Sequence, residues 1–314
     1  MTKVAAVICT YNRYDVLKKA VESLLIQTLP KTEYEIWIID NTPNAEKEEG
    51  KEFSDLYKDI DNLHYVFEKT PGLSNARNVA IRSTSTPYIS YLDDDAIAEP
   101  QWLEEVIKGF ESFENVGVVG GRIAPIWEIP RPTWLGDELV GNVSVVDWGG
   151  ALRVAEEGEW FAGANISFRR EVLVESGGFS VNLGRKGGGQ ILLSNEENEV
   201  LAFVKESKYL EIYNPLASVD HLVESKRLRR AWFRRRAAWQ AASDFMLKPE
   251  EMETQLTDMI QNLRDYLSSL PPIHRNIQGL FYETDDPGIF QWQLSAIYSN
   301  TTLNLAGFDG VENV

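Results

Sequence analysis

Three consecutive aspartates, Asp93, Asp94 and Asp95, are the residues of this chain best suited to chemistry. They follow the aromatic and β-branched run 88–92, which has the composition of a buried strand. Like charges at a strand end repel one another and are costly to bury. A divalent cation would offset both costs, because hard ions such as Mg²⁺ bind carboxylate oxygens. The triplet therefore indicates either a metal site for a phosphate-bearing substrate or a solvated turn, in which aspartate is also common.

The segments around the triplet alternate between strand and helix patterns. They follow one another at 4–9, 17–25, 35–39, 63–67, 73–80 and 88–93. This order predicts an α/β fold with a mainly parallel sheet and helices on both faces. Parallel strands bring their carboxyl ends to one edge of the sheet. We therefore expect the polar residues 10–13, Asp40 and the triplet to lie together.

Composition and missing motifs argue against several classes of protein. The formal net charge of −17 disfavours binding to nucleic acid and uniform adhesion to anionic lipid. Cys9 is the only cysteine, so an intrachain disulfide or a cysteine zinc cluster is impossible. The chain also lacks the glycine-rich fingerprints of dinucleotide-binding and P-loop proteins. It has neither a signal-peptide pattern nor an apolar run of membrane-spanning length, which favours a soluble cytoplasmic enzyme.

Four short motifs follow one another before the second third of the chain. They are V-I-C-T-Y-N-R at 7–13, I-I-D-N at 38–41, G-L-S-N-A-R-N at 72–78 and L-D-D-D at 92–95. In this order and spacing they resemble glycosyltransferase family 2. The resemblance implies the GT-A fold, a nucleotide-sugar donor, an inverting reaction and a bound Mn²⁺ or Mg²⁺. It favours the metal site over the solvated turn.

The resemblance also implies roles for residues that bind the donor. Thr10, Asn12 and Arg13 stand where the family contacts the nucleotide. Asp40 would accept a hydrogen bond from the base. Arg77 would lie near the donor phosphates, since arginine suits phosphate geometry, although it could also form a structural ion pair with the triplet.

A metal-binding set is implied in the same way. Asp93 and Asp95 match the family's D-x-D pair, with Asp95 as the direct metal ligand and Asp93 shared between donor and metal. Asp94 belongs to the same donor-binding stretch and receives no further role. His221 stands where the family often completes the metal site, and neutral imidazole is a competent ligand, whereas an isolated histidine is more often structural.

The second part of the chain contains the expected acceptor side of the site. A strand at 116–123 leads into a segment at 124–150 rich in proline and tryptophan, whose indoles either shape an acceptor site or pack the loop onto the core. A strand and helix at 160–170 precede Gly-Gly-Phe at 177–179, another family-like feature. The glycine-rich stretch 184–189 is either a lid over the donor or a flexible connector.

The candidate general base is one of two adjacent glutamates, Glu196 and Glu197, at the start of a predicted helix. The family carries an acidic pair here, and its second member acts as the base, which points to Glu197. Glycosyl transfer needs a base within hydrogen-bond reach of the acceptor hydroxyl. The other interpretation is a charged helix start without chemistry, which Ser194 would cap.

A basic segment at 226–236 stands out in this acidic chain. On a helix, Arg235 falls on the apolar stripe, where an unpaired charge is costly, so we expect it to point inward at a donor phosphate or a carboxylate. Arg227, Arg230 and Arg234 form a separate stripe. That stripe either docks on anionic lipid or a phosphate-linked acceptor, or is a solvated face.

The sequence thus predicts a GT-A catalytic domain over 1–225 and a C-terminal helical region over 226–314. The catalytic domain would divide into a nucleotide-sugar half, 1–100, and an acceptor half, 101–225. The helical region could pack on the catalytic domain, form a homodimer contact or contribute to acceptor binding.

The expected activity is metal-dependent hexosyl transfer, with a UDP-sugar as the assumed donor. The acceptor hydroxyl belongs to a glycan, a lipid-linked sugar or a small molecule, and the enzyme would be cytoplasmic or peripheral at the inner face of the membrane. Two rivals remain: a sugar-phosphate nucleotidyltransferase, which would release pyrophosphate, and a non-catalytic sugar- or nucleotide-binding module.

Overall fold

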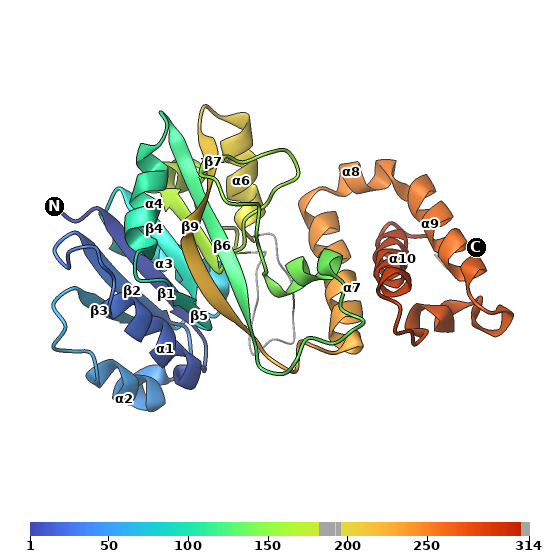
Figure 1. Ribbon diagram of the computed structural model, residues 1–314, viewed down its shortest axis with the longest axis horizontal. Helices are drawn as coiled ribbons and strands as arrows, with labels where there is room; N and C mark the ends of the chain where they lie inside the picture. The colour runs from blue at the N-terminus through green and yellow to red at the C-terminus, as the bar shows by residue number, and fades with distance from the viewer. Residues whose placement is uncertain (182–191, 193–195, 309–314) are drawn as a thin grey trace. The chain divides into compact units, whose positions relative to one another are not determined.

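The computed structural model in Figure 1 describes residues 1–181, 192 and 196–308, without the side chain of Glu196. Contacts divide the chain into two compact units. The first contains 1–126, the described part of 144–190, and 196–222, and the second contains 127–143 and the described residues from 223 onward, with Leu192. The division into domains at residue 225 stays a prediction.

The first unit is an α/β structure around one sheet. Its strands are β1 Val4–Thr10, β2 Tyr34–Asp40, β3 Leu63–Phe67, β4 Tyr88–Asp93, β5 Ala96–Ala98, β6 Val116–Trp127, β7 Arg153–Val154, β8 Asn165–Arg169 and β9 Leu210–Val223, of which β6 and β9 each end one residue inside the second unit. Its helices are α1 Tyr14–Leu25, α2 Glu49–Asp55, α3 Leu73–Ser83, α4 Trp102–Glu111, α5 Arg170–Glu175 and α6 Glu196–Glu206.

The strand order is β3-β2-β1-β4-β8-β6-β9-β5, with β7 paired to β9. Strands β3, β2, β1 and β4 run parallel, whereas β8 is antiparallel to both β4 and β6. Helices α1, α3 and α4 pack on β1, all but one of whose residues are buried, as expected for a parallel strand covered on both faces. The predicted α/β sheet with flanking helices and a helical C-terminal part is confirmed.

The register of the parallel strands gathers polar residues at one edge. Thr10 lies opposite Asp40, and Cys9 lies opposite Asp93. The polar residues at the carboxyl ends of β1, β2 and β4 therefore share this edge, as the strand pattern predicts.

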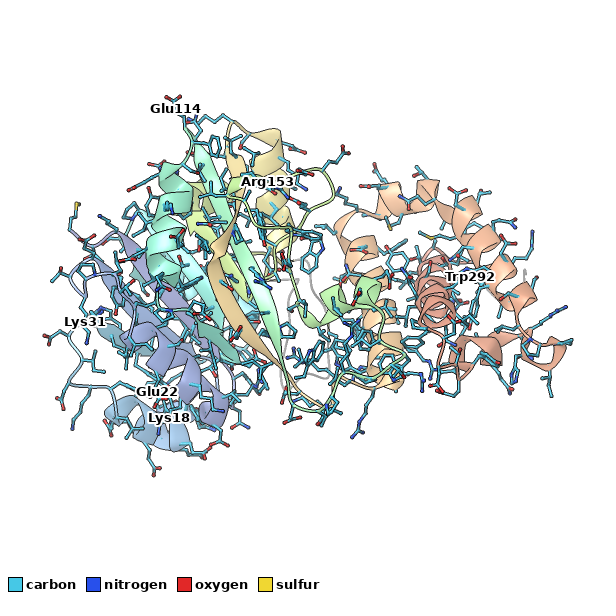
Figure 2. All side chains as sticks on the ribbon, viewed as in Figure 1. Lys18, Glu22, Lys31, Glu114, Arg153 and Trp292 are labelled. Carbon is cyan, nitrogen blue, oxygen red and sulfur yellow. The ribbon has the colours of Figure 1, made fainter. Side chains whose placement is uncertain are left out.

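The second unit is helical. It contains α7 Arg230–Leu247, α8 Pro249–Thr254, α9 Leu256–Ser269 and α10 Pro287–Leu305. Helix α10 packs on α7 and α9, and Trp292 of α10, labelled in Figure 2, donates its indole N–H to Asn262 of α9 over 3.0 Å. The ring of Trp134 meets those of Phe233 and Phe290 edge to face at 5.4 and 5.1 Å. Within the described ranges, no helix is long and apolar enough to cross a membrane.

The expected inward orientation of Arg235 is wrong. Arg235 is exposed, and the buried arginine of α7 is its neighbour Arg234. Arg234 donates to Gln293 over 2.9 Å and to Glu283 over 2.8 Å, so the buried face of α7 is offset from the apolar stripe by the packing of α10. Arg230 of the basic stripe also pairs with Glu283. Docking of this stripe on anionic lipid stays a prediction, and so does the formation of a homodimer.

One buried amide ties several elements of the first unit together. Asn165, at the start of β8, accepts a hydrogen bond from the indole N–H of Trp102 on α4 at 2.9 Å. It donates to the carbonyl oxygen of Arg122 on β6 at 3.0 Å and to that of Ala217 on β9 at 2.8 Å. A single side chain therefore satisfies polar groups from three other elements in a water-poor interior.

We predict that Asn165→Ala lowers the free energy of unfolding by about 2–4 kcal/mol, because it leaves an indole N–H and two carbonyl groups without partners. Chemical denaturation followed by intrinsic fluorescence measures the change. Asn198→Ala, at an exposed position of α6, is the matched control and should change stability by less than about 0.5 kcal/mol. Equal losses in the two variants would contradict the prediction.

Candidate functional site

The aspartate triplet stands at the carboxyl end of β4 and is largely withdrawn from solvent. Asp93 is half-buried, whereas Asp94 and Asp95 are 6% and 5% exposed. The next residues, Ala96 to Ala98, form β5 and pair with β9, so the chain re-enters the sheet immediately after the triplet. Burial of two adjacent carboxylates distinguishes the triplet from an ordinary solvated turn.

The pairing of β5 with β9 brings His221 to the triplet. His221 lies opposite Ala96, and the amide of Leu222 donates to the carbonyl oxygen of Asp95 over 2.9 Å. The imidazole Nε2 lies 3.2 Å from Asp95 Oδ1. Asp93, Asp95 and His221 each offer one ligand atom, and these atoms all lie within 4.8 Å of one another.

This cluster fits a divalent metal ion. Ligand bonds of about 2.0–2.2 Å at right angles place neighbouring donor atoms about 3 Å apart, close to the observed 3.2 Å between Asp95 and His221. Carboxylate oxygens suit Mn²⁺ and Mg²⁺, and neutral imidazole is a common metal ligand. His221 is 1% exposed, and its Nδ1 has no hydrogen-bond partner in the described part of the chain. The three residues could therefore hold a divalent ion.

Arg13 and Thr10, at the end of β1, supply hydrogen bonds to the triplet. Arg13 donates to Asp94 Oδ1 at 2.7 Å and to Asp95 Oδ2 at 2.8 Å, and the hydroxyl of Thr10 donates to Asp94 Oδ2 at 2.8 Å. Burial, followed by the adjacent charge of Asp95, raises the pKa of Asp94 to about 7, although Arg13 and Thr10 oppose the rise. Asp94 thus anchors β1 to the triplet.

Asp40 lies in a separate hydrogen-bond network at the end of β2. Its carboxylate is fully buried and accepts from the hydroxyls of Tyr14 at 2.9 Å and Tyr65 at 2.7 Å, and from the amide of Thr42 at 3.0 Å. The hydroxyl of Thr42 accepts from the amide of Asn12, which is exposed and has a positive φ of 54°. The network fixes the loop after β2, and contact of Asp40 with a base stays a prediction.

A buried ion pair joins α3 to α6. Arg77 is almost fully buried and donates to Glu197 Oε1 at 2.8 Å. Its guanidinium lies 5.3 Å from the ring centre of Phe179 and 5.6 Å from that of Tyr91. The carboxylate of Glu197 remains partly exposed at the first turn of α6. The arginine expected near donor phosphates and the glutamate expected as base are therefore direct neighbours.

Two features of this neighbourhood could be read only partly from the sequence. Gly163 packs so closely that a Cβ there would lie 2.1 Å from both Arg77 Nη2 and Glu197 Oε1. In the sequence, only the run of small residues at 162–164 indicates such a close approach. Asn78 exchanges two hydrogen bonds with the backbone of Phe179, at 2.7 and 2.9 Å, and so fixes the Gly-Gly-Phe turn. Nothing local in the sequence signals the partners of Asp40.

Several predicted site residues are not part of the site as described in the first unit. Arg235 belongs to the second unit and is exposed. The side chain of Glu196, the glycine-rich stretch 184–189 and Ser194 lie outside the described residues. Their predicted roles stay predictions.

The sequence matches the family model of Glycosyl transferase family 2 over residues 5–175. It is 30% identical over 244 residues to the glucosyl-dolichyl phosphate glucuronosyltransferase of Haloferax volcanii, which covers 77% of this chain and 76% of the relative. It is 33% identical over 124 residues to glycosyltransferase AglE of the same organism, covering 38% of this chain and 39% of the relative.

The fold resembles that of the mannosyltransferase PcManGT from Pyrobaculum calidifontis, solved in complex with GDP-Man and Mn²⁺. The TM-score is 0.57 at 18% sequence identity, over 97% of this chain and 75% of the other. At this identity the likeness concerns the fold alone.

We predict that Gly163→Ala destabilises the first unit by about 1–3 kcal/mol, because its methyl group would overlap the Arg77–Glu197 ion pair. Chemical denaturation measures the loss. The matched control is Gly150→Ala, where a Cβ would meet no atom within 4 Å. If both substitutions have the same effect, the close packing at Gly163 is not energetically important.

Proposed function

Since the chain belongs to glycosyltransferase family 2, we propose that this glycosyltransferase moves a sugar from a nucleotide-diphosphate sugar to the hydroxyl of a lipid-linked sugar, with inversion. The observation that carries the donor part is the cluster of Asp93, Asp95 and His221 at the carboxyl end of β4. The lipid-linked acceptor is suggested by the Haloferax relative, whose name specifies transfer to glucosyl-dolichyl phosphate. The donor nucleotide, UDP in the simplest case, is part of the proposal.

The donor would be held along the edge where β1, β2 and β4 end. Asp95 and His221 would ligate Mn²⁺ or Mg²⁺, with Asp93 shared between metal and donor. The ion, when bound, would neutralise charge that develops on the leaving diphosphate. Thr10, Asn12 and Asp40 would face the nucleoside. Arg13 would keep the buried carboxylates oriented through its bonds to Asp94 and Asp95.

The ion pair between Arg77 and Glu197 connects donor binding to the base. Arg77 would bind the donor diphosphate, because a guanidinium makes paired hydrogen bonds to phosphate oxygens. Glu197 touches Arg77 directly, so the base and the diphosphate would flank the same sugar, with the anomeric carbon between the acceptor hydroxyl and the leaving group. This adjacency supports a direct displacement, in which the acceptor oxygen and the leaving group would stand on opposite faces of one carbon.

The transfer step then needs no covalent intermediate. Glu197 would accept the proton of the acceptor hydroxyl as its oxygen attacks the anomeric carbon. The bond between that carbon and the phosphate oxygen breaks on the opposite face, and the nucleoside diphosphate leaves with the bonding electrons. One displacement inverts the anomeric configuration.

We predict that nucleoside diphosphates stabilise the protein in thermal-shift measurements with Mn²⁺, and that Asp95→Asn abolishes the metal-dependent part. A ligand at a hundred times its Kd stabilises by about 2.7 kcal/mol. UDP and GDP would be compared with and without metal. Asp147→Asn, at an exposed carboxylate paired with Arg122, is the control and should respond like wild type. Full metal-dependent stabilisation of Asp95→Asn would exclude Asp95 as a ligand.

We predict that Glu197→Gln lowers kcat by about 10²–10⁴-fold and leaves nucleotide binding intact, because it removes the proton acceptor but keeps the shape of the side chain. Release of nucleoside diphosphate from the sugar donor measures turnover. Glu199→Gln, exposed on the same helix, should retain wild-type kcat. An active Glu197→Gln enzyme would move the base to Glu196 or another group, and release of pyrophosphate would indicate a nucleotidyltransferase.

A further inference from the structure

Trp160 is an exposed indole close in sequence to the candidate site. It is 37% exposed, although tryptophan is among the most costly side chains to leave in water. It lies in the first unit, on the segment that leads from β7 to β8. The donor site and the base proposed above do not use it.

The backbone of Trp160 is held by a polar network. Its carbonyl oxygen accepts the indole N–H of Trp148 at 3.0 Å, and the two rings meet edge to face at 6.1 Å. Arg153, on β7 and labelled in Figure 2, donates to the carbonyl oxygen of Trp148 at 2.9 Å and to Glu159 at 2.8 Å. These hydrogen bonds hold in place the backbone segment that carries the Trp160 ring.

The next residue anchors the segment from the other side. Phe161 is buried and packs so tightly on Gly120 of β6 that a Cβ at that glycine would lie 2.0 Å from the phenyl ring. The buried phenyl ring therefore fixes the backbone next to the residue that carries the exposed indole.

The backbone of Trp160 is close in the chain to a residue that packs on the candidate base. Gly163, which packs against Glu197, follows Trp160 by three residues. Three residues span at most about 11 Å when fully extended. One or two sugar rings would bridge such a distance, so a ring resting on Trp160 could present a hydroxyl to Glu197.

We propose that Trp160, supported by Trp148, is a stacking platform for the sugar ring of the acceptor. This inference rests on the proposed function and deepens it. The apolar C–H face of a pyranose covers a flat indole, while its hydroxyls remain available for polar contacts. The platform selects a lipid phosphate that already carries a sugar over a bare lipid phosphate.

Direct saccharide binding tests the platform without donor or lipid. Methyl β-glucoside is titrated in saturation-transfer NMR, and binding to Trp160→Ala should weaken about tenfold or more. Trp160→Phe keeps an aromatic face and should bind within a fewfold of wild type. Trp160→Leu keeps apolar bulk without a flat face and should behave like the alanine variant. The matched control is Phe113→Ala, at an aromatic side chain that is 45% exposed before β6.

Steady-state kinetics give an independent reading. Trp160→Ala should raise the acceptor KM about tenfold and leave the donor KM and the metal-dependent nucleotide stabilisation unchanged, which also shows that the variant is folded. Glucoside binding unaffected by Trp160→Ala and Trp160→Leu, or a change confined to the donor KM, would overturn the platform. A protein that binds glucoside through Trp160 but no nucleoside diphosphate would instead contradict the proposed function.

Discussion

The concentration of negative charge at the carboxyl end of β4 constrains the rest of the first unit. Asp94 and Asp95 are buried side by side, and unpaired charges in such a position would strongly oppose folding. Arg13 contacts both carboxylates, and His221 approaches Asp95 from β9. Side chains from segments far apart in the sequence therefore meet at one charged cluster. The short strand β5, which directly follows the triplet, pairs with β9 and so brings His221 to this cluster.

A second charged contact organises the other side of the site. The ion pair between Arg77 and Glu197 crosses 120 residues of sequence and is enclosed by Gly163 and the ring of Phe179. Both partners come from helices, Arg77 from α3 and Glu197 from the first turn of α6. The first unit thus has two charged centres, one on strands and one on helices, and the proposed donor site uses both.

The parts of the fold that follow from local pattern could be predicted from the sequence. Alternating apolar runs identify the strands β1, β2 and β4 and the helices between them, and the register of parallel strands then fixes which polar ends meet. The grouping of Asp93 and Asp95 with His221 was expected only through family resemblance, because the pairing of β5 with β9 is a long-range contact.

Features set by tertiary packing were not accessible. Arg235 was expected to face inward, but the docking of α10 selects Arg234 instead. The two tyrosines that satisfy Asp40 lie on α1 and β3, and no local pattern links them to β2.

The contacts of Asn165 are also long-range, and one of them bears on the metal-binding cluster. Its side-chain amide donates a hydrogen bond to the backbone of Ala217, four residues before His221 on β9. That amide limits how far β9 can slide, and with it the spacing between His221 and the carboxylates. Asn165 also pairs with Leu92, the residue before Asp93, so a substitution there would change the spacing of the side chains that we propose as metal ligands.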